Sequence, residues 1–200
     1  MNTSMRAAFV LCGMLFCGCG SSPNTTYYTL AAVSGSVRQA SLGAIEVRRP
    51  NIAGYLDRTE ILAQWDGQRL QLASNSGWAE PIAAMIGRVL ADDLNDRLRG
   101  TVVISTAAEL AIQSTAVVEL VIRKFDLGAD GYVHLNAIWS TRGLGARAAD
   151  LKVRPVTTED TGAIVAAMSG VLGQLADEIA AALLERPAPP QGGSASPTEG

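Results

Sequence analysis

The chain has 200 residues, enough for one domain with a hydrophobic core of its own. Hydrophobic residues make up 48% of it, which is typical of a globular protein and argues against a disordered one. The net charge of −3 at pH 7 argues against a nucleic-acid partner, which selects a basic stripe, and against electrostatic docking on anionic lipid.

The first residues have the layout of a secretory signal peptide. One positive charge at Arg6 precedes the mostly apolar run 7–16. This run is shorter than the ~20 apolar residues that a membrane-spanning helix needs, so we expect residues 1–18 to be a signal peptide that is removed.

Small residues and a cysteine follow that apolar run. The segment 15–19, Leu-Phe-Cys-Gly-Cys, resembles the lipobox of bacterial lipoproteins, in which a small residue precedes the cysteine that is acylated. Gly18 precedes Cys19, so Cys19 is the expected lipidation site and carries palmitate or similar acyl chains. The alternative is an ordinary signal peptide whose cleavage leaves a free thiol. Residues 20–26 then form a polar leash.

Sites of catalysis and metal binding are not predicted. All three cysteines lie at or before position 19, so the mature domain can form neither an internal disulfide nor a thiolate metal site. His134 is the single histidine, and one histidine does not supply the ligand set of a metal site or a complete nucleophilic triad. The sequence also lacks Gly-x-Ser-x-Gly, His-Glu-x-x-His and a phosphate-binding Gly loop with Lys. We therefore expect no enzymatic activity, no cofactor and no metal.

The first half of the body shows strand patterns followed by a helix. Alternating apolar residues predict strands at 27–30, 42–48, 60–65 and 68–73. Asp66-Gly67 is a hairpin signal between the last two strands. Apolar residues three and four apart predict a helix over 78–98, with Pro81 in its first turn and Gly100 as its stop. The acidic pair Asp92-Asp93 is expected on its solvated face.

The second half repeats this order. Strands are predicted at 101–106, 116–125, 132–141 and 146–153. A helix over 158–185 follows, with Thr157 or Thr158 as its cap and Glu159 and Asp160 favourable to its dipole. Hairpin-linked strands imply antiparallel pairing, and two helices with one apolar stripe each must cover the sheet. The predicted fold is an α+β two-layer sandwich, a mostly antiparallel sheet covered by two long helices. Open strand edges would offer places for a second copy to add.

This domain is expected to span residues 27–186. Residues 19–26 before it comprise the lipidated cysteine and the leash, and residues 187–200 form a Pro/Gly/Ser tail expected to be disordered.

Short segments along the chain form a recognisable set. The lipobox is followed by Tyr27–Leu30, then Tyr55–Arg58 leading into Glu60–Leu62, and then Trp78–Pro81 opening a helix that continues with Arg88–Leu90. Together these segments resemble the ABC-type transport auxiliary lipoprotein family, that of the PqiC-like intermembrane transport lipoproteins. The resemblance covers the mature chain up to about residue 185.

The resemblance implies a non-enzymatic accessory lipoprotein, anchored in the outer membrane by its acyl chains and facing the periplasm. The implied partners are an MCE-domain periplasmic protein and an ABC permease and ATPase. Such a system moves lipid or other hydrophobic cargo between the membranes and supports membrane integrity. The chain could also assemble as a homo-oligomer. Two alternatives stay open: a lipoprotein that itself binds a small hydrophobic ligand between sheet and helices, and an envelope-assembly lipoprotein unrelated to transport.

Five residues are candidates for contact with a partner. Tyr55, Leu56, Asp57 and Arg58 could form a contact loop, because aromatic residues and Arg are enriched at interfaces. The alternative is a turn whose Asp57 and Arg58 pair or face water. Trp78 could be a recognition residue, or it could pack at the start of the predicted helix as a hydrophobic staple.

Overall fold

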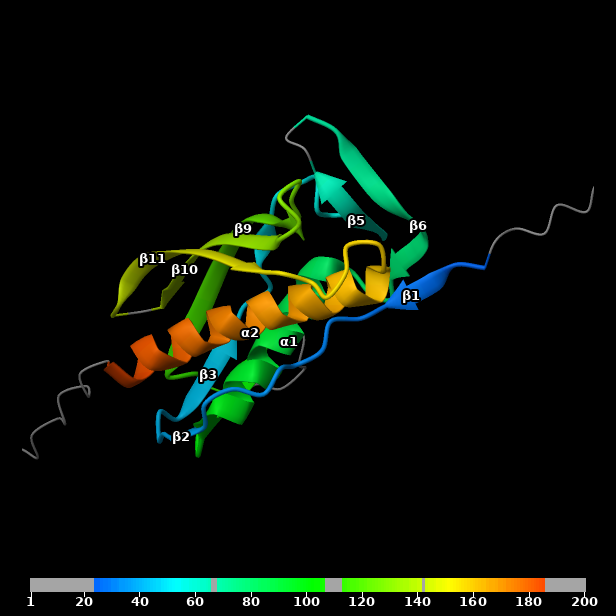
Figure 1. Ribbon diagram of the computed structural model, residues 1–200. Helices are drawn as coiled ribbons and strands as arrows, with labels where there is room; N and C mark the ends of the chain where they lie inside the picture. Colours follow the sequence, from blue (N-terminus) through cyan, green and yellow to red (C-terminus); the bar gives the residue numbers. More distant parts are fainter. Residues whose placement is uncertain (1–23, 66–67, 107–112, 142, 186–200) are drawn as a thin grey trace, which may run out of the picture.

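The computed structural model describes residues 24–65, 68–106, 113–141 and 143–185 (Figure 1). The expected signal peptide 1–18, the expected lipidation site Cys19, the hairpin signal Asp66-Gly67 and the expected tail 187–200 lie outside the described residues.

Two helices and eleven strands make up the described chain. The helices are α1 (Ile82–Arg97) and α2 (Thr161–Glu185). The strands are β1 (Thr26–Tyr28), β2 (Arg38–Gln39), β3 (Ala44–Val47), β4 (Asn51–Ile52), β5 (Glu60–Trp65), β6 (Leu70–Trp78), β7 (Leu98–Arg99), β8 (Val102–Ser105), β9 (Ala116–Leu127), β10 (Val133–Thr141) and β11 (Gly145–Val153).

The main sheet has the strand order β11-β10-β9-β3-β8, and β4 also pairs with β9. The ladders β9–β10 and β10–β11 are antiparallel, as the hairpin patterns predict. β3 instead runs parallel to both β8 and β9, and β4 runs parallel to β9. Along β10, buried and half-buried residues alternate from Val133 to Thr141, so one face of the sheet is packed and the other is more open.

A smaller sheet has the order β1-β6-β5. β5 and β6 are antiparallel, as the hairpin signal predicts, but β6 continues to Trp78. β1 lies parallel to this last part of β6, with Tyr27 opposite Gly77. The short strands β2 and β7 pair parallel just after the end of α1.

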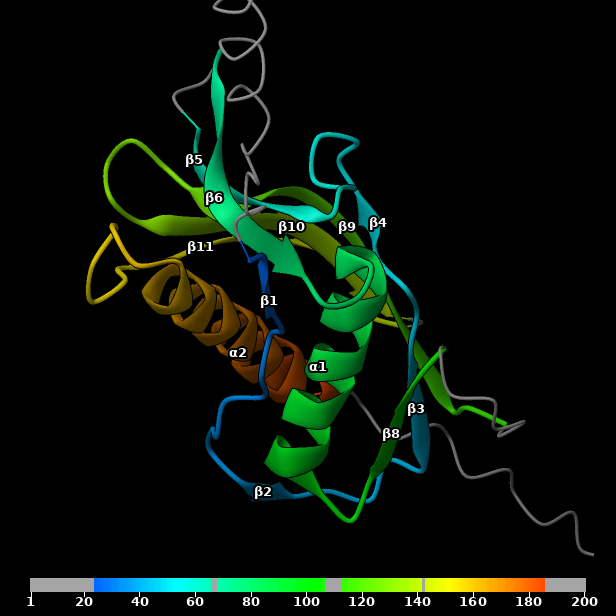
Figure 2. The same ribbon diagram turned by 90° about the vertical axis from the view of Figure 1, so that its right-hand side faces the viewer.

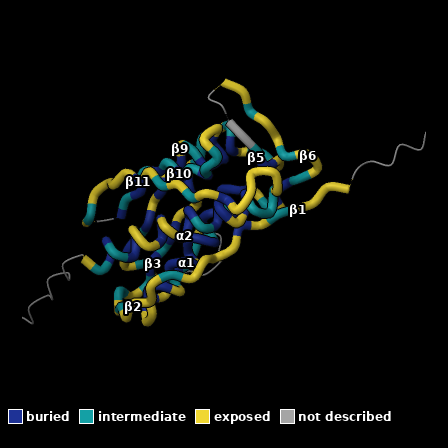
Figure 3. The backbone as a smooth tube through the Cα atoms, viewed as in Figure 1, coloured by how far each residue is buried: buried dark blue, intermediate teal, exposed yellow. Residues whose placement is uncertain are grey.

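Both helices lie on the packed face of the main sheet (Figures 1 and 2). α1 packs on β3 and β8, and α2 packs on β10, β11 and β9. The expectation of an α+β fold with two long helices is confirmed. The core lies between these layers, where the tube of Figure 3 is mostly buried. We call the opposite side of the main sheet the outer face.

The helix starts differ slightly from the expected ones. α1 begins at Ile82 rather than near Trp78, because Trp78 completes β6 and Pro81 stands immediately before the helix. α2 begins at Thr161, where the carboxylate of Asp160 accepts hydrogen bonds from the N–H groups of Gly162 and Ala163. Asp160, not Thr157 or Thr158, therefore caps this helix.

By length and composition α2 could cross a membrane, but it is the central helix of the core. In its most apolar stretch 67% of the residues are buried within the domain. Its stripe of large apolar residues faces the sheet and α1.

The segment between β1 and β2 crosses both helices on their side away from the sheet (Figure 2). We call residues 29–37 the strap. Leu30 is buried, and its N–H lies 3.1 Å from Sδ of Met85 on α1. The N–H of Ala31 donates to Oγ of Ser169 on α2 at 3.2 Å. The strap therefore contacts both helices within two residues.

Candidate functional site

The five candidate contact residues differ in accessibility. Leu56 is 2% exposed and Trp78 is 5% exposed, so both belong to the core. Asp57 is exposed, while Tyr55 and Arg58 are half-buried. Nε of Arg58 donates to the carbonyl oxygen of Tyr55 at 2.7 Å, which stiffens the loop between β4 and β5. Contact with a partner stays a prediction, and it now falls on Tyr55, Asp57 and Arg58.

Tyr55 holds this loop against the main sheet. Its hydroxyl donates to Oδ2 of Asp126 on β9 at 2.7 Å. Asp126 is fully buried, and Nζ of Lys124 lies 3.8 Å from its other carboxylate oxygen. Burial raises the pKa of the Asp126 carboxyl, which the Tyr55 hydrogen bond partly offsets, and burial also raises the pKa of the Tyr55 hydroxyl. The loop is therefore fixed to β9 by a hydrogen bond from Tyr55 to a buried carboxyl group.

His134 lies on the outer face of β10, as a strand side chain. Its Nε2 is 2.9 and 3.0 Å from the two carboxylate oxygens of Asp130 in the preceding turn. This hydrogen bond lowers the pKa of the Asp130 carboxyl. Within the described residues no group of three or more His, Cys, Asp and Glu side chains is placed to hold a metal ion. The pair is an ordinary turn contact, and the absence of catalysis stays a prediction.

A polar cluster in the core is built around Arg97, in the last turn of α1. Its side chain is 2% exposed. Nε donates to Oδ1 of Asp177 on α2 at 2.7 Å, and Nη2 donates to the carbonyl oxygen of Gly173 on α2 at 3.0 Å. Nη1 donates to the carbonyl oxygens of Val33 at 2.9 Å and Asp93 at 3.0 Å. One guanidinium therefore joins α1, α2 and the strap, and we call this cluster the strap clamp.

Asp93 completes the strap clamp. It was expected on a solvated face beside Asp92, and that is wrong: Asp92 is exposed but Asp93 is fully buried. Its Oδ1 accepts a hydrogen bond from the N–H of Val33 at 2.7 Å and lies 3.3 Å from Nη1 of Arg97. Burial raises the pKa of Asp93 to about 6, against the opposing effects of these partners.

Two glycines let the strap approach the strap clamp closely. A Cβ on Gly35 would lie 2.4 Å from Cζ of Arg97. A Cβ on Gly173 would lie 3.2 Å from Cβ of Val33 and 3.4 Å from Nη2 of Arg97. The strap therefore lies directly on the guanidinium, with no room for larger residues at these positions.

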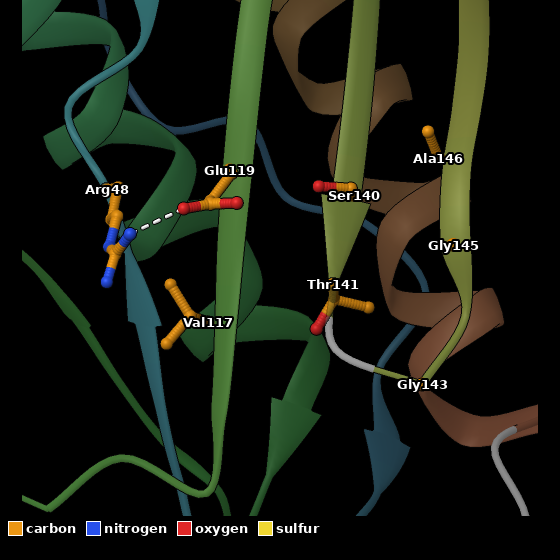
Figure 4. A pocket seen from close by; sticks show the side chains of 8 residues that line it. All are labelled: Arg48, Val117, Glu119, Ser140, Thr141, Gly143, Gly145 and Ala146. Atoms are coloured by element: carbon orange, nitrogen blue, oxygen red, sulfur yellow. Dashed lines mark hydrogen bonds and ion pairs between the residues drawn. The ribbon is translucent and has the colours of Figure 1, made fainter.

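A shallow groove marks the outer face near the β10–β11 turn (Figure 4). The hollow of about 390 Å³ is lined by Arg48, Val117, Glu119, Ser140, Thr141, Gly143, Gly145 and Ala146. A second hollow of about 370 Å³ shares Arg48, Glu119, Ser140 and Ala146 with it, so the two are continuous. Arg48 forms an ion pair with Glu119 across one side. Small side chains at Ser140 and Ala146 leave the surface hollow.

A family model matches this chain over residues 28–180, that of the ABC-type transport auxiliary lipoprotein component. Since the match covers most of the chain, the protein belongs to this family. The family consists of auxiliaries of ABC transport systems rather than of a class of enzymes, and a lipoprotein of such a system is located in the cell envelope. The expectation from the sequence segments is confirmed at this level.

Solved structures show the same fold. The crystal structure of an uncharacterized protein is 19% identical, covers 79% of this chain and 97% of its own, and superimposes with a TM-score of 0.64. Protein XCC0632 from Xanthomonas campestris, of the family DUF330, is 20% identical, covers 78% of this chain and 93% of its own, and has a TM-score of 0.61. A comparison with curated proteins finds no match.

Proposed function

We propose that this protein is a tether: an accessory lipoprotein held in the outer membrane by acyl chains on Cys19, with its domain in the periplasm. Its partner in this proposal is an MCE-domain protein of an ABC transport system that carries lipid or other hydrophobic cargo between the membranes. The observation that carries the proposal is the family match, which begins at residue 28, shortly after the lipobox cysteine. The anchor thus joins the matched domain almost directly.

The structure suits a tether because only a short segment of chain separates the proposed anchor from the folded domain. A leash of residues 20–25 spans at most about 20 Å when extended. β1 then pairs with β6, and the strap clamp fixes the next residues to both helices. A pull on the anchor is therefore borne by the sheet and by a buried guanidinium, and the domain keeps a limited distance from the bilayer.

Two exposed parts of the domain could contact a partner in this proposal. Asp57 is exposed, and the outer-face groove lies on the side of the main sheet away from the helices. In this proposal one or both meet the transport complex, and the domain acts by holding it in place. No step of chemistry is assigned to the protein.

The test is cross-linking in intact cells, followed by purification of the full-length tagged protein from detergent-solubilised membranes. We expect an MCE-domain protein and its permease and ATPase to be recovered with it. The Cys19→Ala variant is the control: it should leave the membrane fraction and lose most of this recovery. Recovery of no MCE-type protein, together with an unchanged outer-membrane barrier in a deletion strain, would contradict the proposal.

A further inference from the structure

The strand β11 forms one edge of the main sheet. Its nine residues pair with β10 alone, and no other backbone hydrogen bond of the described chain involves them. Alternate N–H and C=O groups along its free side therefore lack a backbone partner within the described residues. No proline interrupts the strand, and most of its residues are exposed. An open edge of this kind is a template for another strand.

The side chains of β11 are complementary to themselves. Asp150 and Lys152 lie on the outer face, opposite Asn136 and His134 of β10, and Leu151 lies half-buried between them on the other face. If a second copy pairs antiparallel about a two-fold axis at Leu151, each Asp150 stands opposite a Lys152. Opposite charges at directly paired positions stabilise an antiparallel ladder.

Neighbouring registers are less favourable. A two-fold axis perpendicular to the sheet keeps the outer faces of both copies on the same side. Because side chains alternate between the two faces, the residue at the axis must then stand opposite the same residue of the second copy. Moving the axis by one residue places Asp150 opposite Asp150, or Lys152 opposite Lys152. Like charges at directly opposed positions destabilise the pairing. The charge pattern therefore favours Leu151 as the centre.

The end of the strand agrees with this register. Pro155 has no N–H and would end the new ladder just beyond Val153.

We propose that the β11 edge is an interface between two copies of this chain, paired antiparallel about Leu151 so that their main sheets form one continuous sheet. The inference rests on the geometry and charges of β11 and not on the transport role. Its failure would leave the proposed function untouched.

Cysteine cross-linking of the full-length protein in membranes tests the register. On a two-fold axis a residue meets itself, so the Leu151→Cys variant should form a disulfide-linked dimer under mild oxidation. Asp150→Cys and Lys152→Cys should each fail to do so alone, but should cross-link when the two variants are expressed together. This mixed pair also tests the proposal if Leu151→Cys does not fold.

Charge exchange provides the matched control. In the Leu151→Cys background, Asp150→Lys or Lys152→Asp should reduce the dimer fraction several-fold, and the double exchange should restore it. The proposal is overturned if neither the Leu151→Cys variant nor the mixed pair yields a dimer, if the charge changes have no effect, or if Leu151→Cys cross-links only to a different polypeptide.

Discussion

Nη1 of Arg97 donates a hydrogen bond to the carbonyl oxygen of Val33 at 2.9 Å, which joins the end of α1 to the strap. The same guanidinium reaches Gly173 and Asp177 on α2. One buried cation thus connects the first part of the domain after the expected anchor with both helices that cover the sheet. In the proposed function, the strap clamp is therefore the point where the tether is joined to the two helices of the domain.

Replacement of Arg97 by Met should destabilise the protein strongly. The change removes the hydrogen bonds to both helices and the strap, and it leaves Asp93 buried without its cation. Breaking a buried ion pair in this way costs about 3–5 kcal/mol. Urea unfolding of the purified protein measures the loss. Arg88→Met is the control: Arg88 has exposed ion pairs with Glu80 and Asp92, so its loss should cost under about 1 kcal/mol. If both variants lost the same unfolding free energy, the buried contacts of Arg97 would contribute no more than an exposed ion pair does.

Gly35→Ala should displace the strap. The new methyl group would lie 2.4 Å from Cζ of Arg97, so either the strap or the guanidinium must move. We expect a loss of about 1–3 kcal/mol and faster amide hydrogen exchange across residues 29–37. Gly54→Ala is the matched change, because nothing lies within 4 Å of a Cβ at that position. It should change the stability by under about 0.5 kcal/mol. Unaltered exchange in Gly35→Ala would argue against close packing of the strap.

Protonation of Asp93 should make the folded protein more stable in mild acid than at neutral pH. Its pKa is raised to about 6 in the folded state, above its ordinary value of 3.8, so the folded protein binds the proton more tightly. This contribution is complete below pH 4 and is lost as the pH rises through 6. Lowering the pH from 7.5 to 5 should therefore add about 1 kcal/mol to the unfolding free energy. The Asp93→Asn variant should lack this part of the rise, and parallel curves would contradict the assignment.

Variants of Tyr55 and Asp57 should distinguish an effect on stability from an effect on contact with a partner. Tyr55→Phe removes the hydroxyl that donates to the buried Asp126, and an unsatisfied buried acceptor costs about 1–3 kcal/mol. Asp57→Ala, at an exposed position, should leave the thermal unfolding midpoint nearly unchanged. If the loop meets a partner, Asp57→Ala should still reduce cross-linking to the transport complex. A full yield of cross-links from a correctly folded Asp57→Ala variant would remove Asp57 from the contact.

The elements that local pattern determines could be predicted. Apolar residues three and four apart predict α1 and α2, and alternation across a short turn predicts the ladder of β9 and β10. Parallel pairing could not be predicted in the same way. β3 lies between β8 and β9, which are far from it in the sequence. A local pattern of apolar residues does not indicate which distant strands pair. The α+β class could therefore be inferred, but not the mixed order of the sheet.

The strap clamp could not be recognised from residue type alone. Asp93 and Arg97 are charged residues, so both look like solvated positions of an amphipathic helix. Their spacing was the available signal: Asp93 comes three residues after the buried Leu90, and Arg97 follows Asp93 by four, which continues the buried stripe. Trp78 was misplaced for a related reason, because β6 continues up to the residues that introduce α1. Only the assembled structure shows the strap crossing both helices.

We propose above all that an acylated Cys19 tethers this domain to a membrane. Intact-mass measurement of the full-length protein purified from native membranes tests it most directly. We expect a chain that begins at Cys19 and carries the added mass of acyl chains. An unmodified N-terminus, or a Cys19→Ala variant that stays in the same membrane fraction, would contradict it.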